Sequence, residues 1–407
     1  MKNVLFISYY FPPINTPGAF RAGKFAKFLP ELGWNPIILT IKPNKNDELD
    51  FNLLREIPES VRIFRVPSYD PKFKGYSKIR KFLPMSYSDG VFWKNRAIIK
   101  GYKIAKEFKI DLIWSTALPP VCHIVGKSLK KSLGCPLVLD YRDPWVGNPY
   151  IKYPFKFQRF IDFYIEKTII NEADAIVGIS NSILNNINKN YSYSGKKILI
   201  PNGYDPDDFP DHELTIVKNT ITHLGNLYGR RTQVALGFLQ KLLNLENLFP
   251  DLSSKLSIQF IGNVHKSIID FSIKNFQFIN IKFLGKINHS TAIDIMCRSD
   301  KLLLIIEEKN VNTLASKVFE YIASNRPVLI TGFSDEVSKL TKNFNNIFFI
   351  NNYDEEMLLR ILLFGNKIHD SEEFDDNLNR LGFLQNYSRK NQTSKLANVF
   401  NALCAKK

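Results

Sequence analysis

The chain has 407 residues, of which 44% are hydrophobic, and its formal net charge is +16 at pH 7. This length is typical of two domains, and the apolar content suffices for two cores. The four cysteines lie far apart without a CxxC pair, which argues against a disulfide framework or a zinc site and favours a reducing compartment. The positive charge predicts attraction to phosphate groups or anionic surfaces.

The first apolar run, Val4–Ile7, is too short for a signal peptide or a membrane-spanning helix. No other apolar run approaches membrane-spanning length. We therefore expect a cytoplasmic protein, either free or attached peripherally to the inner face of the cell membrane.

The first 40 residues have the pattern of a βαβ unit. Val4–Ser8 and Pro36–Thr40 are short apolar runs typical of buried parallel strands, and apolar residues recur at helical spacing between them. Gly18, at the helix entrance, would let a phosphate approach the backbone closely, or would serve only as a turn residue. The GxGxxG fingerprint of dinucleotide-binding proteins is absent.

Basic and aromatic residues interleave from Arg62 to Lys109, with Phe82, Phe92 and Trp93 among the rings. Such a tract is typical of a surface that contacts an anionic membrane or an anionic acceptor. The alternatives are an ordinary solvated surface with snorkelling lysines and a nucleic-acid surface. No nucleic-acid-binding motif accompanies the tract, so we expect no nucleic-acid partner.

Charged residues follow a predicted strand in the next part of the chain. Asp111–Ser115 and Leu137–Leu139 are expected strands, and Asp140, Arg142 and Asp143 come directly after the second. Functional groups of doubly wound sheets cluster beyond the carboxyl ends of strands, which makes these three residues site candidates. The alternative is a cluster that only caps and pairs charges.

The composition changes at the Pro- and Asp-rich stretch Asp205–Val217, which we interpret as a linker. Further apolar runs precede and follow it, separated by helical stretches: Ala173–Ile179, Lys197–Ile200, Thr220–Leu224, Ser257–Ile261, Ile281–Leu284, Leu302–Ile306, Val328–Ile330 and Ile347–Ile350. The sequence therefore predicts an α/β protein with two Rossmann-like doubly wound domains facing each other across a cleft. The hinge is expected at Asn202 and Gly203.

One stretch of the second half combines these signals. A polar loop follows Leu302–Ile306, and we expect a helix to open near Thr313. Lys317 and Glu320 are three residues apart and so share one face of that helix. A cation and a carboxylate there could hold a diphosphate and a ribose, although an exposed surface ion pair has the same spacing.

In order, and over nearly the whole chain, these landmarks resemble the GT-B fold retaining glycosyltransferases of family 4. The resemblance implies an acceptor domain over residues 1–204, completed by a C-terminal helix at 386–407, and a nucleotide-sugar donor domain over 205–385. The matching stretches are Tyr10-Phe-Pro-Pro13 with Gly18 and Arg21, Asp111-Leu-Ile113 with Pro119-Pro120, Asp140-Tyr-Arg-Asp-Pro-Trp145, Asp174-Ala-Ile-Val177 then Ser180, Ile200-Pro-Asn-Gly-Tyr-Asp205, Gly225-Asn-Leu-Tyr-Gly-Arg-Arg231, Phe283-Leu-Gly-Lys-Ile287 and Ser316-Lys-Val-Phe-Glu-Tyr321.

The resemblance also implies roles for single residues. Glu320 corresponds to the glutamate that holds the donor ribose, and Arg230 or Arg231 to the cation that clamps the diphosphate. Two positions depart from the family pattern: Asn312 replaces a glutamate, and Asn226 falls where an arginine is usual. The implied donor-binding set is Gly18, Arg21, Gly225, Asn226, Arg230, Ile287, Asn312, Lys317, Val318 and Glu320.

The implied catalytic groups are Asp143, Lys317 and Arg231. Asp143 is the nearest substitute for a family histidine that has no counterpart in Ser115–Pro120. Cations at the diphosphate would stabilise the charge that develops on the leaving group. No pair of carboxylates of the glycosidase type is needed.

The resemblance thus implies metal-independent, retaining transfer of a hexose from a UDP- or GDP-sugar, with no separate cofactor, to a glycan or lipid-linked acceptor in cell-surface polysaccharide biosynthesis. Two alternatives stay open. One is a sugar-nucleotide 2-epimerase of the same fold, and the other is a non-catalytic nucleotide-sugar-binding protein. An NAD-dependent oxidoreductase is disfavoured because the glycine fingerprint is missing.

Overall fold

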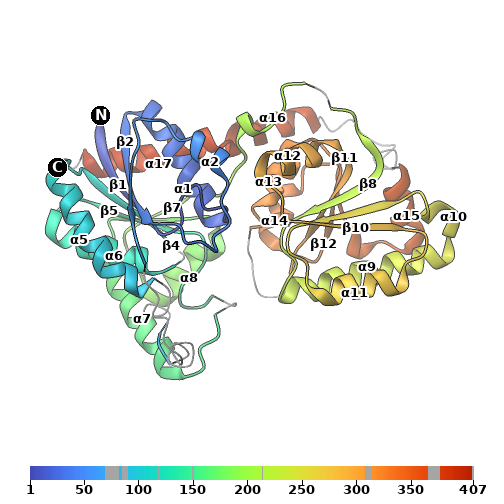
Figure 1. Ribbon diagram of the computed structural model, residues 1–407, viewed down its shortest axis with the longest axis horizontal. Coiled ribbons are helices and arrows are strands. Elements are labelled where there is room, and N and C mark those ends of the chain that lie inside the picture. Colours follow the sequence, from blue (N-terminus) through green and yellow to red (C-terminus); the bar gives the residue numbers. More distant parts are fainter. Residues whose placement is uncertain are drawn as a thin grey trace. The chain divides into compact units, whose positions relative to one another are not determined.

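The computed structural model describes residues 1–68, 82–84, 90–117, 119–148, 151–212, 214–307, 314–364 and 376–405. The chain divides into two compact units, shown in Figure 1. The N-terminal unit comprises Met1–Asn202 and Arg389–Lys407, and the C-terminal unit comprises Gly203–Ser388. The sequence-based boundaries fall at 204/205 and 385/386.

The described part of the N-terminal unit contains a seven-stranded sheet in the order β3-β2-β1-β4-β5-β6-β7, with every pairing parallel. Both faces of its central strands are buried, which explains their uninterrupted apolar runs. The strands are β1 (Lys2–Ser8), β2 (Trp34–Ile41), β3 (Arg62–Val66), β4 (Leu112–Ala117), β5 (Leu137–Tyr141), β6 (Ala175–Gly178) and β7 (Lys196–Leu199).

Helices cover both faces of this sheet because successive strand residues point to opposite sides. Val4 and Phe6 pack towards α1 and the C-terminal helix α17, whereas Leu5 and Ile7 pack in the core that contains α5 and α6. The helices of this unit are α1 (Pro17–Phe28), α2 (Phe51–Arg55), α5 (Val91–Glu107), α6 (Val121–Leu133), α7 (Lys156–Asn171), α8 (Asn181–Tyr191) and α17 (Arg389–Cys404), with a 3-10 helix at Leu29–Leu32.

The C-terminal unit is built in the same way, with a described six-stranded parallel sheet in the order β10-β9-β8-β11-β12-β13. Its strands are β8 (Val217–Leu224), β9 (Ser257–Ile261), β10 (Asn280–Gly285), β11 (Ser299–Ile305), β12 (Val328–Thr331) and β13 (Ile347–Phe349). Its helices are α9 (Arg230–Leu248), α10 (Pro250–Ser253), α11 (Lys266–Asn275), α12 (His289–Arg298), α13 (Lys317–Ala323), α14 (Asp335–Thr341), α15 (Glu355–Phe364) and α16 (Asp376–Tyr387), with 3-10 turns at Pro206–Asp208 and Ile350–Asn352. The predicted α/β class with two doubly wound sheets is confirmed.

Two segments of the chain differ from the sequence-based expectation. The basic tract opens with an edge strand, β3, and Trp93 of the tract lies fully buried in the core instead of offering a ring to a membrane. The helix expected near Thr313 begins at Lys317, because Leu314 is buried and the Ala315 carbonyl accepts the Val318 N–H in a turn that precedes it.

None of the described helices is long and apolar enough to cross a bilayer.

A buried ion pair joins three parts of the N-terminal unit. Arg21 of α1 is 1% exposed and donates to both carboxylate oxygens of Asp140 at the end of β5. Its remaining N–H groups donate to the carbonyls of Ile200 and Pro201, which follow β7. Thr116 of β4 donates to the same carboxylate at 2.8 Å. The pair therefore fixes α1 against the carboxyl ends of three strands.

We predict that Arg21→Leu lowers the free energy of unfolding of the N-terminal unit by about 3–5 kcal/mol, because it leaves the Asp140 carboxylate buried without its counter-charge. All four tryptophans lie in this unit, so tryptophan fluorescence during chemical denaturation reports on it selectively. The control is Glu31→Gln, which removes an exposed pair with Lys390 and should cost less than about 1 kcal/mol. Similar losses in both variants would contradict the role of Arg21.

Candidate active site

The strand order of each sheet reverses once, between β1 and β4 in one unit and between β8 and β11 in the other. Connections from the two central strands leave towards opposite faces at such a point, which opens a crevice beyond their carboxyl ends. In the C-terminal unit, β8 leads into α9 and β11 leads towards α13. The starts of these helices are where the predicted diphosphate-binding residues lie.

The turn after β8 is held against the end of β9. Gly225 donates its N–H to the Ile261 carbonyl at 2.8 Å, and Asn226 accepts the N–H of Asn263 through its side-chain oxygen at 2.9 Å. A Cβ on Gly262 would lie 2.5 Å from the Gly225 carbonyl oxygen, so this close approach requires glycine. Asn226 therefore fixes the turn.

Helix α13 is attached to the same point by a buried tyrosine. The hydroxyl of Tyr321 accepts the N–H of Leu224, the last residue of β8, at 2.9 Å. Lys317 stands one turn earlier and forms an ion pair with Glu320, with side chains 30% and 17% exposed. The Val318 side chain is buried and its N–H donates to Ala315, so it shapes the start of α13 from within.

His223 is a residue of this site that the sequence-based analysis missed. Its Nδ1–H donates to the Leu303 carbonyl at 2.9 Å, and its Nε2 lies 3.5 Å from the place of a Cβ on Gly225. Burial is the main cause that lowers its pKa to about 4, and the charges of Arg231 and Lys317 lower it further. The imidazole is thus neutral at pH 7 and lies close to both predicted phosphate-binding cations. Its position two residues before Gly225, at a strand end, was the available signal.

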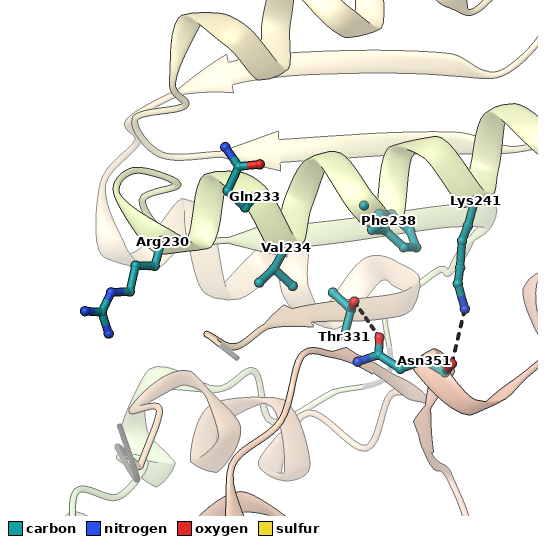
Figure 2. A pocket seen from close by; sticks show the side chains of 8 residues that line it. Arg230, Gln233, Val234, Phe238, Lys241, Thr331 and Asn351 are labelled. Atoms are coloured by element: carbon teal, nitrogen blue, oxygen red, sulfur yellow. Dashed lines mark hydrogen bonds between the residues drawn. The ribbon is translucent and has the colours of Figure 1, made fainter. Parts of the chain in front are cut away.

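Arg230 and Arg231 open α9, with Arg230 exposed and Arg231 half-buried. Arg230 also lines a pocket of about 550 Å³, shown in Figure 2, with Gln233, Val234, Gly237, Phe238, Lys241, Thr331 and Asn351. Thr331 donates to the Asn351 side chain at 2.9 Å, and Lys241 donates to the Asn351 carbonyl at 3.3 Å. Lys317 and Glu320 do not line it, and among its described lining residues Arg230 belongs to the predicted diphosphate site.

Two other predicted donor contacts fall elsewhere. Ile287 follows β10 and is half-buried against the core that contains α13. Asn312 lies outside the described residues. The predicted roles of both residues stay predictions.

In the N-terminal unit, the corresponding reversal point brings Gly18 and Arg142 together. A Cβ on Gly18 would lie 3.0 Å from a guanidinium nitrogen of Arg142, whose Nε–H donates to the Ala117 carbonyl at the end of β4. Burial lowers the pKa of Arg142, whereas the nearby charge of Asp143 raises it. Asp143 is half-buried beside this guanidinium, so the aspartate and the arginine form one charged group at the start of α1.

Arg21 does not fit the donor-binding role implied by the resemblance. Its guanidinium N–H groups are bound to Asp140, to backbone carbonyls and to the side-chain oxygen of Asn202 inside the N-terminal unit, where a phosphate has no access to them. The predicted hinge residue Asn202 is also buried and accepts from Arg389 at the start of α17. Both residues are therefore part of the scaffold at the boundary of the unit.

Two buried titratable side chains lie near the segment that carries Arg142 and Asp143. His123 of α6 lies 2.8 Å from the Ser115 hydroxyl through Nδ1, and burial lowers its pKa to about 3. Glu166 of α7 accepts the Val146 N–H, which follows the Arg142–Trp145 turn, and burial raises its pKa to about 7. Glu166 therefore positions the end of that turn.

Known proteins are similar to this chain in sequence over part of its length and in fold over all of it. Residues 22–208 match the model of the family described as Glycosyltransferase Family 4. Sucrose-phosphate synthase from Thermosynechococcus elongatus has a similar structure over the whole of both chains, with a TM-score of 0.69 at 15% identity. No sequence match was found among curated proteins.

Two further solved structures are similar. Phytolacca americana UGT2, complexed with UDP-2fluoro-glucose and pterostilbene, gives a TM-score of 0.55 at 10% identity, with 98% of this chain and 100% of that chain covered. The lipopolysaccharide outer core galactosyltransferase WaaB gives 0.57 at 10% identity, with both chains covered completely. The fold is that of the GT-B proteins, and the family match covers residues 22–208, somewhat less than half of the chain.

The buried His123 predicts a pH dependence of stability. Its pKa in the folded chain, about 3, is below the usual 6.5, so the unfolded state binds more protons as the pH falls. Stability that is fully present above pH 6.5 is therefore lost at up to about 1.4 kcal/mol per pH unit below it. Glu166 acts with the opposite sign, because its pKa is raised and its folded form keeps a proton.

A comparison with His123→Gln separates the two effects. The stability of the wild type relative to this variant should fall by about 1–2 kcal/mol between pH 7 and pH 5. Tryptophan-monitored denaturation at each pH measures this difference. A difference that stays constant with pH would show that His123 is protonated alike in the folded and unfolded states.

Proposed function

We propose that the protein transfers a hexose from a UDP- or GDP-sugar to a glycan or lipid-linked acceptor, with retention of configuration and without a metal ion. The observation that carries the proposal is the cluster of Arg231, Lys317 and Glu320 around the β8/β11 reversal point. In this proposal the protein acts in the biosynthesis of cell-surface polysaccharide, and it is located in the cytoplasm.

The chemistry of the leaving group favours this cluster. Loss of a nucleoside diphosphate places negative charge on phosphate oxygens, and fixed cations stabilise that charge in the transition state. Lys317 and Arg231 supply the cations, and both lie close enough to His223 to lower its pKa. Glu320 would accept hydrogen bonds from the ribose, in exchange for part of its contact with Lys317.

His223 acts in this proposal as a positioning residue. A neutral imidazole adds no charge of its own, and its bond to Leu303 joins β8 to β11 beneath the Gly225 turn. The turn and the cations thus keep their places before the donor arrives. Preorganised groups of this kind need no rearrangement during the reaction.

The N-terminal unit would supply the groups at the sugar and the acceptor. Asp143 is the proposed catalytic carboxylate, with Arg142 beside it and the Gly18 backbone at the start of α1. Asn312 would contact the sugar in place of a glutamate. In the retaining mechanism that the family resemblance implies, the acceptor arrives from the side of the leaving group, so a second carboxylate would not be required.

One similar structure supports a nucleotide-sugar donor, and another supports a glycan acceptor. The Phytolacca protein was solved with a UDP-sugar analogue, and WaaB is named for lipopolysaccharide. Contact of the Arg62–Lys109 tract with an anionic membrane stays a proposal, since residues 69–81 and 85–89 lie outside the described structure.

The proposal is tested by incubating the chain with UDP-, GDP- and ADP-sugars and measuring release of the nucleoside diphosphate, with and without acceptor glycans. We expect one UDP- or GDP-sugar to release its nucleoside diphosphate, and the release should continue when a chelator removes metal ions. NMR should show that the product has the anomeric configuration of the donor. Epimerised donor without transfer would favour the 2-epimerase alternative. Binding without any turnover would favour a non-catalytic protein.

Glu320→Gln should weaken binding of the nucleotide-sugar about 10- to 100-fold, because a charge-assisted hydrogen bond to the ribose is worth about 1.5–3 kcal/mol. Isothermal calorimetry measures the change. Glu356→Gln is the matched control, since Glu356 forms an exposed i,i+4 pair with Arg360 on α15. Unchanged affinity in Glu320→Gln would remove this residue from the donor site.

Lys317→Ala and Arg231→Ala should each lower the affinity for the nucleoside diphosphate about tenfold or more, and the affinity for the monophosphate less. Turnover should fall in both variants. Arg298→Ala, which removes a half-exposed pair with Asp294, is the control. Equal losses for monophosphate and diphosphate would argue against a clamp on the diphosphate.

A further inference from the structure

The outer side of α7 carries an exposed aromatic surface that the proposed reaction does not use. Five of the large apolar side chains that are exposed in the described residues lie on or beside the start of this helix: Phe82, Phe155, Phe157, Phe160 and Tyr164. Figure 1 shows α7 at the margin of the N-terminal unit. We call this set the α7 face. Exposed apolar clusters of this kind mark places where another surface binds.

The helix separates its side chains by charge. Lys156, Phe160, Tyr164 and Lys167 follow one another at helical spacing and are all exposed, with Phe160 at 70% and Tyr164 at 63%. The helix is described completely, and its only acidic residues, Asp162 and Glu166, are buried on the opposite side. Its exposed charges are therefore all positive.

The buried acids are satisfied within the unit. Asp162 accepts from the Tyr153 hydroxyl at 3.0 Å, and Glu166 accepts from the Tyr191 hydroxyl at 2.5 Å. In contrast, Lys156 and Lys167 form no ion pair with any described residue. Their charge is thus available to an external anionic group.

Three rings of the α7 face lie against one another instead of in a core. Phe82 stacks on Phe155 at 5.3 Å between ring centroids, and Phe155 stacks on Phe157 at 5.7 Å. Gln158 ties the segment that carries Phe82 to α7 by donating to the Leu83 carbonyl at 3.1 Å. The aromatic surface is therefore held together before any partner arrives.

We propose that the α7 face binds the surface of an anionic lipid bilayer. Aromatic side chains flanked by lysines are the combination that inserts at the level of lipid headgroups, with the rings in the interface and the ammonium groups on the phosphates. The net charge of +16 adds long-range attraction of the same sign. The inference does not depend on glycosyl transfer, since none of these residues belongs to the proposed donor site.

The test is flotation of the full chain with vesicles of phosphatidylcholine, with and without phosphatidylglycerol. We expect binding to the anionic vesicles at about 0.05 M salt and much less at about 0.5 M, because salt screens the headgroup charge. Phe160→Ser/Tyr164→Ser and Lys156→Glu/Lys167→Glu should each reduce the bound fraction about tenfold. The matched control is Ile273→Ser/Lys274→Glu, an equally exposed pair on α11 of the C-terminal unit, which should bind like the wild type.

Thermal unfolding and far-ultraviolet spectra of each variant verify that it folds. Absence of flotation by the wild type at low salt would overturn the proposal, as would equal losses in the α11 control. The proposal would also fall if light scattering showed a wild-type dimer that Phe160→Ser/Tyr164→Ser converts to a monomer, since the α7 face would then bind a second copy. Because flotation needs no donor or acceptor, its outcome is independent of the activity assay.

Discussion

Parallel pairing of every described strand is the constraint from which the candidate site follows. Parallel strands need crossover helices on both faces, and all their carboxyl ends meet at one edge. The reversal of strand order then selects one place on that edge. In the C-terminal unit it gathers His223 and Arg231 of one segment with Lys317 of a distant one. In the N-terminal unit it gathers Gly18, Arg142 and Asp143.

The side chains at these points are of two kinds. Buried side chains hold the helices in place, and half-exposed side chains are accessible to a ligand. Tyr321 holds α13 against β8, and the Arg21–Asp140 pair holds α1 against β5. A buried pair of this kind costs desolvation, which good hydrogen-bond geometry offsets. Lys317 and Glu320 stay accessible beside such fixed groups. Rigid support beneath accessible charge is the arrangement that electrostatic catalysis requires.

The central strands could be predicted because both of their faces are buried. Val4–Ser8 and Leu302–Ile306 are uninterrupted apolar runs for this reason, and the structure places strands there. The edge strand β3 was missed because it is only partly buried and its sequence mixes arginine with apolar residues. The start of α13 was placed too early, since a buried turn at Leu314 and Ala315 has no local signature.

The candidate site could be predicted from the sequence only in part, for a related reason. The spacing of Lys317 and Glu320 gives their shared face directly, because helix geometry is local. Long-range contacts leave no such trace. Arg21 was assigned to the donor, yet Asp140, more than a hundred residues away, occupies its guanidinium. His223 resembles any lone histidine in a strand until the register places it beside Leu303 and the Gly225 turn.

The central claim is that the β8/β11 reversal point binds the nucleoside diphosphate. Hydrogen exchange of the full chain with and without saturating UDP or GDP tests it most directly, because binding slows the opening of the segments that contact the ligand. We predict slower exchange over Gly225–Arg231 and Ser316–Tyr321 with one of the two nucleotides. Protection that is absent from both segments, or confined to other parts of the chain, would contradict the claim.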